Sequence, residues 1–355
     1  MRPIRLPSNP RVLVVVLRRL GDVLLATPLM RSVKQAFPAA SIDALVFAGT
    51  EGILAGNPDL HGVITIPQSP SVGESLALLR RLRRHYDLAL STQAGDRPTT
   101  LAFIAGRQSA GLLEAGGLSA AIKRFVLSRS CTADRRQHRV LDNLRLAETL
   151  GIPALAKIVC PAGAARPGLV PAQPYAVVHA APMYVYKRWT MDGWRALVVA
   201  LRERGLATLV SGAEADRRYL DEVWRQCDVT RLDGKLEWPE LSAVIGAARV
   251  YIGPDTAITH LAAATGTQTV ALYGPTDPRI WGPWPIGGLD RPWTAAGTIQ
   301  RRGNVWLVQN PLPCLPCQLE GCERRLDSYS RCLDELSVVQ VMSAVDQALT
   351  TRQAA

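Results

Sequence analysis

Short apolar runs alternate along this chain with longer segments in which apolar residues recur at helical spacing. Residues 11–17 (RVLVVVL) form one such run, and its Val content is typical of a strand buried on both faces of a parallel sheet. A helical pattern follows over residues 23–37 and ends before a proline. In the first half, the alternation also predicts strands over residues 42–47, 63–66 and 88–91, and helices over residues 73–85 and 140–150.

A Pro-rich segment, residues 160–174, interrupts the alternation and is the best candidate for a linker. The alternation then resumes. It predicts strands over residues 175–179, 207–211, 229–232, 250–253 and 269–273, and helices over residues 192–204, 215–226, 240–247, 257–264 and 338–350.

Repeated strand–helix alternation requires parallel sheets with helices on both faces. We therefore predict an α/β protein with two Rossmann-like domains, residues 1–165 and 166–355, facing each other across a cleft. The last helix could return to pack on the first domain. Ligands of such open sheets bind at the carboxyl ends of the strands, so a cleft between the domains would bring both sets of strand ends together.

Composition narrows the class of protein. With 355 residues, 48% of them hydrophobic and 20% charged, the chain can form two cores and is not a disordered tail. No apolar run approaches the roughly 20 residues that a membrane-spanning helix needs. The first apolar run is also shorter than the hydrophobic region of a signal peptide, so we expect a cytoplasmic protein.

The net charge of +11 predicts an anionic partner, such as a nucleic acid, acidic lipid headgroups or a phosphorylated substrate. Proteins that bind single-stranded nucleic acid usually place aromatic residues among their basic ones. This chain has only four Phe, and most of its Trp lie outside the basic clusters. A nucleic-acid-binding module with a zinc site is therefore a remote alternative, and no nucleic-acid partner is expected.

The turn after the first strand argues against two common nucleotide chemistries. It reads LRRLGD over residues 17–22 and so lacks the G-x-G-x-x-G of a dinucleotide site, and no phosphate-binding P-loop motif occurs anywhere. Instead it places Asp22 at the carboxyl end of a strand and the start of a helix. Asp22 can be an N-cap, a general base for an acceptor hydroxyl, or both.

The second half presents polar residues at comparable positions. Lys187 follows the strand over residues 175–179, where it is either an ordinary exposed cation or a contact for a ligand at the strand ends. Thr256 and Ala257 open a helix whose N–H groups and dipole favour an anion such as diphosphate. His260 lies one turn further along on the same face, either as a ligand contact or as a structural hydrogen-bonding group.

Five segments, taken together and in this order, resemble glycosyltransferase family 9, the lipopolysaccharide heptosyltransferases. They cover most of the chain: LGDVLLATPL at residues 20–29, KRW at 187–189, SGAE at 211–214, GPDTAITHLAAATG at 253–266 and LYGPTDP at 272–278.

The resemblance implies the GT-B fold and the transfer of a heptose from an ADP-activated donor to a sugar hydroxyl of the lipid A–core acceptor, with inversion at the anomeric carbon. Inversion fits a single in-line displacement that needs one base and a stabilised leaving group. It further implies contact with the anionic inner face of the inner membrane. A relative that uses another nucleotide sugar or a protein acceptor is the alternative within the family.

The resemblance also assigns roles to individual residues. It implies that Asp22 is the general base and that Lys187 offsets the charge on departing ADP. The donor contacts would be Glu214, at the ribose hydroxyls, and Asp255, Thr256, Ala257 and His260, at the helix start. No cofactor would be required for catalysis, because the lysine and the helix dipole neutralise the diphosphate.

Two departures from the family pattern concern the acceptor and the donor loop. Arg18 and Arg19 stand where several first-heptose enzymes carry small hydroxyl residues, and Ala257 stands where some members have Gly. Because of the first departure, the chain looks nearer to second- or third-heptose enzymes or to relatives acting on other glycans. Arg18 and Arg19 are our candidates for acceptor binding.

Four of the seven cysteines lie within 19 residues near the C-terminus: Cys314, Cys317, Cys322 and Cys332. Thiolates at C-x2-C spacing can bind one tetrahedral Zn or Fe ion. Similar groups occur in second-heptose relatives, and autotransporter-modifying relatives have a cysteine-bound iron. The alternatives are a structural Zn or Fe site, reduced thiols without a ligand, and a redox pair.

Overall fold

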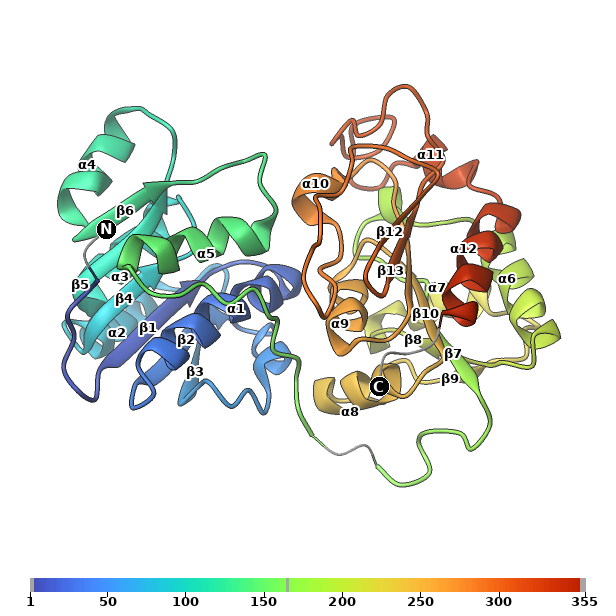
Figure 1. Cartoon of the computed structure of the whole chain (residues 1–355), viewed down its shortest axis with the longest axis horizontal. Coiled ribbons are helices and arrows are strands. Elements are labelled where there is room, and N and C mark those ends of the chain that lie inside the picture. The colour runs from blue at the N-terminus through green and yellow to red at the C-terminus, as the bar shows by residue number, and fades with distance from the viewer. Residues whose placement is uncertain (1–2, 164–165, 352–355) are drawn as a thin grey trace. The chain divides into compact units, whose positions relative to one another are not determined.

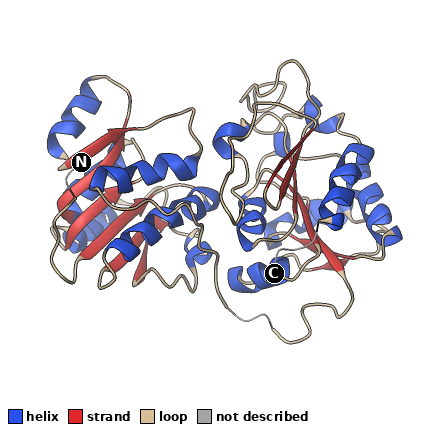
Figure 2. Cartoon of the chain, viewed as in Figure 1, coloured by secondary structure: helices blue, strands red, loops and turns tan. Residues whose placement is uncertain are grey.

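The computed structural model describes residues 3–163 and 166–351. The chain forms two compact units, Met1–Pro161 and Ala162–Ala355, and the division falls within the Pro-rich segment. Each unit contains one sheet flanked by helices (Figures 1 and 2). Among the helices of the described residues, none is both long enough and apolar enough to cross a membrane.

The first unit is built on six parallel strands in the order β3-β2-β1-β4-β5-β6. The Val-rich run of β1 lies at the centre, with Val12 to Val16 fully or almost fully buried. The strands are β1 Arg11–Val16, β2 Ser41–Phe47, β3 Gly62–Ile66, β4 Tyr86–Ser91, β5 Gly106–Leu113 and β6 Arg129–Thr132. The helices are α1 Leu20–Ala36, η1 Glu51–Leu54, α2 Val72–Leu82, α3 Asp96–Ala105, α4 Leu118–Val126 and α5 Arg139–Leu150.

Helix packing covers the two faces of this sheet. Helices α1 and α5 pack against each other, and α3 packs against β1, β4 and β5 together with α2. Local signals fix some of the ends. Ser71 and Glu74 form a capping box at the start of α2, and α5 ends at Gly151, whose φ of +72° favours glycine.

The second unit has seven strands in the order β12-β13-β11-β10-β7-β8-β9. All pairs are parallel except β12 with β13, which form an antiparallel hairpin at one edge. The strands are β7 Tyr175–His179, β8 Ala207–Ser211, β9 Thr230–Arg231, β10 Val250–Pro254, β11 Thr269–Leu272, β12 Ile299–Arg302 and β13 Val305–Val308. The helical elements are η2 Val185–Lys187, α6 Met191–Glu203, η3 Glu214–Asp216, α7 Arg217–Val223, α8 Trp238–Gly246, α9 Ala257–Thr265, α10 Pro278–Trp281, α11 Arg331–Asp334 and α12 Val338–Thr350.

The last helix, α12, packs within its own unit, against α6, β10, β11 and β13. Its buried residues, among them Val341, Val345 and Ala348, belong to the core formed with Trp194 and Trp306. Its apolar face is already covered by the sheet of the second unit.

The two sheets share a topology that positions the candidate sites. In each sheet, the second and third strands in chain order lie on one side of the first strand. The chain then crosses back, and the fourth strand pairs with the first strand on its other side. The first and fourth strands are β1 and β4 in one sheet and β7 and β10 in the other. A crevice opens at the carboxyl ends of such a pair, and ligands of open α/β sheets bind there.

Candidate functional site

Asp22 lies at the carboxyl end of β1, but it is not an N-cap. Helix α1 begins at Leu20, earlier than the sequence predicts, and Arg19 is the N-cap residue with extended backbone angles. Asp22 is thus the third helical residue, and its carboxylate accepts a hydrogen bond from the backbone N–H of Arg19. A carboxylate in the first helical turn is favourable because the N–H groups there are unsatisfied.

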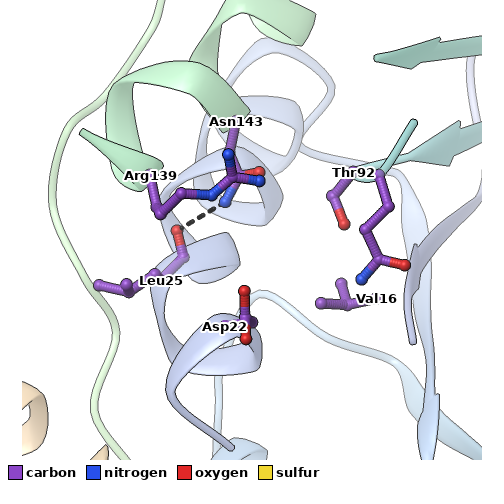
Figure 3. Close-up of a pocket in the computed structure, with 7 residues that line it drawn as sticks. Val16, Asp22, Leu25, Thr92, Arg139 and Asn143 are labelled. Atoms are coloured by element: carbon purple, nitrogen blue, oxygen red, sulfur yellow. Dashed lines mark hydrogen bonds between the residues drawn. The ribbon is translucent and has the colours of Figure 1, made fainter. Parts of the chain in front are cut away.

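The Asp22 carboxylate faces a small hollow (Figure 3). The hollow lies at the switch point of the first sheet, because it is lined by residues from the ends of β1 and β4 and by the two helices α1 and α5. The lining residues are Val16, Asp22, Leu25, Thr92, Gln93, Arg139 and Asn143. We refer to it below as the Asp22 pocket.

Hydrogen bonds hold several walls of the Asp22 pocket in place. Asn143 Nδ2 donates to Leu25 O at 3.1 Å (Figure 3), and the Thr92 hydroxyl donates to Val15 O at 3.0 Å. Arg139 Nη1 donates to Asp142 Oδ2 at 2.9 Å. By contrast, the buried Gln93 Nε2 has no hydrogen-bond partner among the described residues. A buried amide without a partner is costly, so a ligand oxygen in the pocket would satisfy it.

Burial raises the pKa of Asp22 above the usual aspartate value. The positive charges of Arg18, Arg139 and Arg19 and the backbone N–H of Arg19 act in the opposite direction, but they do not cancel the effect of burial. A carboxylate with a raised pKa is a stronger base than an ordinary one, which is the property that a proton acceptor needs.

The two acceptor-binding candidates, Arg18 and Arg19, are exposed at the turn that leads into α1. Their charges act on Asp22, so they lie at the same end of the sheet as the pocket. Guanidinium groups there would attract a phosphorylated ligand.

In the second unit, Lys187 and Asp255 form an ion pair. Lys187 ends η2, after β7, and Asp255 follows β10, so the pair lies at the switch point of the second sheet. Lys187 Nζ donates to Asp255 Oδ2 at 2.5 Å, and the two side chains are only 20% and 8% exposed. The ammonium also lies 6.0 Å from the centre of the Tyr186 ring.

Further donors surround Asp255. The Tyr273 hydroxyl donates to Asp255 Oδ1 at 3.3 Å, and the Thr276 side chain also hydrogen-bonds to the carboxylate. Burial alone would raise the pKa of Asp255, but the Lys187 ammonium and the hydrogen bonds from Lys187 and Thr276 hold it below the usual value. Asp255 is therefore an ionised group that fixes the position of Lys187.

His260 lies beside this pair, with its Nε2 4.0 Å from Asp255 Oδ1. Burial lowers the pKa of His260 to about 4, and the nearby Lys187 charge adds to this effect. The imidazole is thus neutral at pH 7, so it can donate a hydrogen bond without adding charge. Its Nδ1 is buried and has no hydrogen-bond partner among the described residues.

Helix α9 begins beside the same ion pair. Thr256 is its N-cap, and its side chain accepts the backbone N–H of Thr259. Ala257 is the first helical residue, so its N–H is one of those that the helix leaves unsatisfied. The start of α9 and the Lys187 ammonium together form a positive region suited to a diphosphate.

Glu214 lies elsewhere in the second unit, in η3 after β8. Its side chain is exposed and pairs with Arg217, Nη1 to Oε1, at 3.2 Å. The Cα of Gly234, with a φ of +66°, comes close to the Glu214 backbone, and a side chain at that glycine would collide with it. The Glu214 backbone therefore packs closely against Gly234 just after β8, while its side chain is exposed.

The structure gathers the four C-terminal cysteines only loosely. Cys332 is buried and Cys314 and Cys322 are exposed. Burial, followed by the charges of the other three thiols, raises the pKa of Cys332 to about 12, and the Arg331 N–H donates to Cys322 Sγ at 3.4 Å. Even so, within residues 3–163 and 166–351 no three Cys, His, Asp or Glu side chains are arranged to bind one metal ion.

The sequence interpretation missed several residues of both sites. Thr92 and Gln93 directly follow β4, so the rule that singled out Asp22 could have found them. Arg139 and Asn143 lie one turn apart on α5 and line the pocket only because α5 packs on α1, which no local pattern reveals. Tyr273 directly follows β11, and its hydroxyl reaches Asp255, which follows the neighbouring strand β10.

Comparisons with known proteins agree with this architecture. The family model of glycosyltransferase family 9 (heptosyltransferase) matches residues 75–287, more than half of the chain. Lipopolysaccharide heptosyltransferase 3 of Escherichia coli K12 is 29% identical over 287 residues, which cover 74% of this chain and 82% of that protein.

Solved structures show the same fold. Escherichia coli ADP-heptose LPS heptosyltransferase II matches with a TM-score of 0.71 at 17% identity, over 96% of this chain and 98% of that one. The dodecameric iron-containing heptosyltransferase TibC of enterotoxigenic E. coli matches with a TM-score of 0.59 at 14% identity, over 97% and 77% of the two chains. The chain therefore belongs to glycosyltransferase family 9, the heptosyltransferases, and has the GT-B fold.

Proposed function

We propose that this transferase moves a heptose from ADP-heptose to a hydroxyl of the lipopolysaccharide inner core, with inversion at the anomeric carbon and Asp22 as the general base. The observation that carries the proposal is the Asp22 pocket, in which a carboxylate of raised pKa faces a hollow at the switch point of the first sheet. The names of the relatives support the donor and acceptor class, because they are lipopolysaccharide and ADP-heptose heptosyltransferases.

The acceptor would bind in the first unit. Its attacking hydroxyl gives its proton to Asp22 while the oxygen forms the new bond to the anomeric carbon. Gln93 Nε2 would donate to an oxygen of the acceptor sugar, since the amide is buried, lines the pocket and lacks a partner among the described residues. Arg18 and Arg19 would attract phosphate groups of the core.

The donor would bind in the second unit. The Lys187 ammonium and the start of α9, with Thr256 and Ala257, would bind the diphosphate and offset the charge that develops as ADP leaves. Asp255 holds the lysine in place, and neutral His260 would donate a hydrogen bond. Glu214 would accept hydrogen bonds from the ribose hydroxyls.

We propose that no metal takes part in the transfer step, since Lys187 and the helix dipole supply the positive charge. Activity that is unchanged after exhaustive dialysis against EDTA would support this. A loss of activity that Mg²⁺ restores would contradict it.

The cysteine group is proposed as a separate structural site for Zn or Fe. The C-x2-C spacing of Cys314 and Cys317, the N–H bond to Cys322 and the nearby Cys332 thiol support a tetrathiolate. As placed, the thiols would have to move closer together to share one ion. Metal analysis of purified protein, with the Cys314→Ser and Cys332→Ser variants for comparison, tests this. One equivalent of metal that both variants lose supports the site, and metal-free active protein contradicts it.

The transfer reaction is tested with purified protein, core acceptor lacking one heptose, and a panel that contains ADP-heptose and other nucleotide sugars. Mass spectrometry should show a single heptose added from ADP-heptose alone, and NMR should show the inverted anomeric configuration. Transfer from another nucleotide sugar, or to a protein and not to the core, would favour the alternative within the family. Asp22→Ala should abolish transfer while ADP-heptose still binds.

A further inference from the structure

Helix α4, Leu118–Val126, exposes the apolar side chains that a helix of a globular protein normally buries. Leu118 is 79% exposed, Ile122 55% and Phe125 91%. These three positions lie within about 60° of one another around the helix axis, so they form one continuous stripe. Only Ala120 of this helix is buried. The helix is thus amphipathic with its apolar face turned to solvent.

Polar contacts hold the opposite face of α4 against the unit. Lys123 Nζ donates to Ala94 O at 2.8 Å and pairs with Asp96 Oδ1 at 2.6 Å, and the Ser119 hydroxyl donates to Asp96 Oδ1 at 3.1 Å. The outward orientation of the stripe is therefore fixed by specific bonds.

These contacts also set the stripe near the Asp22 pocket. Ala94, which accepts the Lys123 bond, directly follows Gln93, which lines the pocket. Both belong to the segment that leaves the carboxyl end of β4. In Figure 1, α4 is labelled beside the edge strand β6 of the first unit.

The chain around α4 is strongly basic. Between residues 115 and 139 it carries six basic residues and one acidic residue, Asp134. Arg124 on α4 itself is exposed, as are Arg135 and Arg136 in the segment after β6. An apolar stripe with basic side chains around it complements an anionic membrane surface, where apolar groups enter the headgroup region and cations meet the lipid charge.

We propose that α4 docks the protein on an anionic phospholipid bilayer, with Leu118, Ile122 and Phe125 inserted among the headgroups and acyl chains. The proposal extends the proposed function, because it would hold the pocket beside the membrane in which a lipid-linked acceptor is anchored. The occupant is a lipid surface and not a second copy of the chain, since a basic rim of one sign would repel its own copy and attract anionic lipid.

The test is flotation of the full chain with vesicles of phosphatidylglycerol and phosphatidylethanolamine, compared with vesicles of phosphatidylcholine alone. The double variant Ile122→Gln/Phe125→Gln removes the centre of the stripe and keeps residues of adequate helix propensity. Its matched control is Val339→Gln, which changes a 78% exposed apolar residue on α12. We expect the double variant to lose at least about tenfold in partition onto anionic vesicles and the control to bind like the parent chain.

Binding of the parent chain to neutral vesicles as strong as to anionic ones, no vesicle binding at all, or unchanged binding of the double variant would overturn the proposal. A parent chain that is dimeric in sedimentation while the double variant is monomeric and floats normally would assign the stripe to self-association instead. The single variant Phe125→Gln serves if the double variant unfolds, as judged by its circular dichroism spectrum and melting curve.

A water-soluble, deacylated acceptor separates this proposal from the proposed function. The double variant should transfer heptose to it at the parent rate, because the stripe contacts only the membrane. If the parent chain floats as expected but transfers nothing to this acceptor, the proposed function fails and the docking surface stands.

Discussion

Lys187 Nζ and Asp255 Oδ2 lie 2.5 Å apart at the switch point of the second sheet, in surroundings that leave both side chains largely buried. The two residues are 68 positions apart in the chain, and each follows a different strand of the sheet. The carboxylate thus holds the ammonium at the start of α9. An ammonium has three N–H donors, so one carboxylate can position it without preventing a phosphate oxygen from approaching.

Removing one partner of this pair should destabilise the protein. In Lys187→Met the ionised Asp255 loses its counter-charge, and we expect the free energy of unfolding in urea to fall by about 3 kcal/mol. The double variant Lys187→Met/Asp255→Leu should recover most of that loss and still bind ADP weakly, as measured by calorimetry. As a control, Arg325→Ala breaks the exposed pair with Glu323 and should cost less than about 1 kcal/mol.

Asp22→Asn should abolish transfer and make the protein more stable at neutral pH. The pKa of Asp22 is raised in the folded state, so the folded state favours its protonated form. That stabilisation is present at low pH and is lost as the pH rises through the folded pKa. Asn, which carries no charge, avoids the loss. We therefore expect the Asn variant to have a higher Tm at pH 7 than the parent chain when both are measured by thermal unfolding.

The same pKa gives a check on the role of Asp22 in transfer. In the parent enzyme, kcat/KM should fall with acid at a pH above the usual aspartate pKa, because the base must be ionised. The Tm difference between the Asn variant and the parent should shrink over the same pH range. An Asn variant that retains activity, or a Tm difference independent of pH, would argue against Asp22 as a buried base.

His260 should make the protein sensitive to mild acid. Its pKa is about 6.5 in the unfolded chain and about 4 in the folded protein, so the unfolded state binds the proton more tightly. The stability that the neutral imidazole gives above pH 6.5 is therefore lost as the pH falls toward 4, by roughly 3 kcal/mol at most. In His260→Gln, urea titrations across this range should show a shallower loss; an identical slope would contradict a buried neutral histidine.

Gln93→Leu tests the polar wall of the Asp22 pocket. Leu has a similar size but cannot donate, so the KM for the core acceptor should rise by about tenfold, as expected from one lost hydrogen bond of about 1.4 kcal/mol. The KM for ADP-heptose should stay the same. Since the buried amide lacks a partner among the described residues, the variant should be at least as stable as the parent. A rise in both KM values would indicate a disturbed fold instead of a lost acceptor contact.

The sequence predicted the central strands well, because their composition allows few alternatives. β7, β8 and α12 have the predicted bounds, and β1 and β10 differ by one residue. Such strands are buried on both faces, so apolar runs bounded by turns identify them.

The segment between β4 and α5 was not predicted, for physical reasons. β5 contains Gly, Arg, Gln and Ser and is a strand because it pairs between β4 and β6. The hairpin of β12 and β13 was also not predicted. It adds an antiparallel edge to the sheet, whereas the strand–helix alternation predicts only parallel strands. In α4 the apolar residues recur at helical spacing but face solvent, so their pattern says nothing about packing within the unit.

For the candidate site, the sequence predicted individual polar residues that follow strands. Asp22, Lys187 and Asp255 each follow a strand, and two of them form the observed ion pair. Their electrostatic states were not predictable, because burial decides the raised pKa of Asp22 and the neutrality of His260. The spacing of the cysteines suggested a tighter group than the structure forms.

The Asp22 pocket draws all its walls from residues 16 to 143, and the group around Asp255 draws its members from residues 187 to 276. The proposed acceptor site and the proposed donor site are therefore each formed by one uninterrupted stretch of polypeptide, on opposite sides of the Pro-rich segment in the sequence. Chimaeras joined within that segment should inherit sugar-acceptor choice from one parent and nucleotide choice from the other. We expect such chimaeras to exchange acceptor and donor specificity without a change to either sheet.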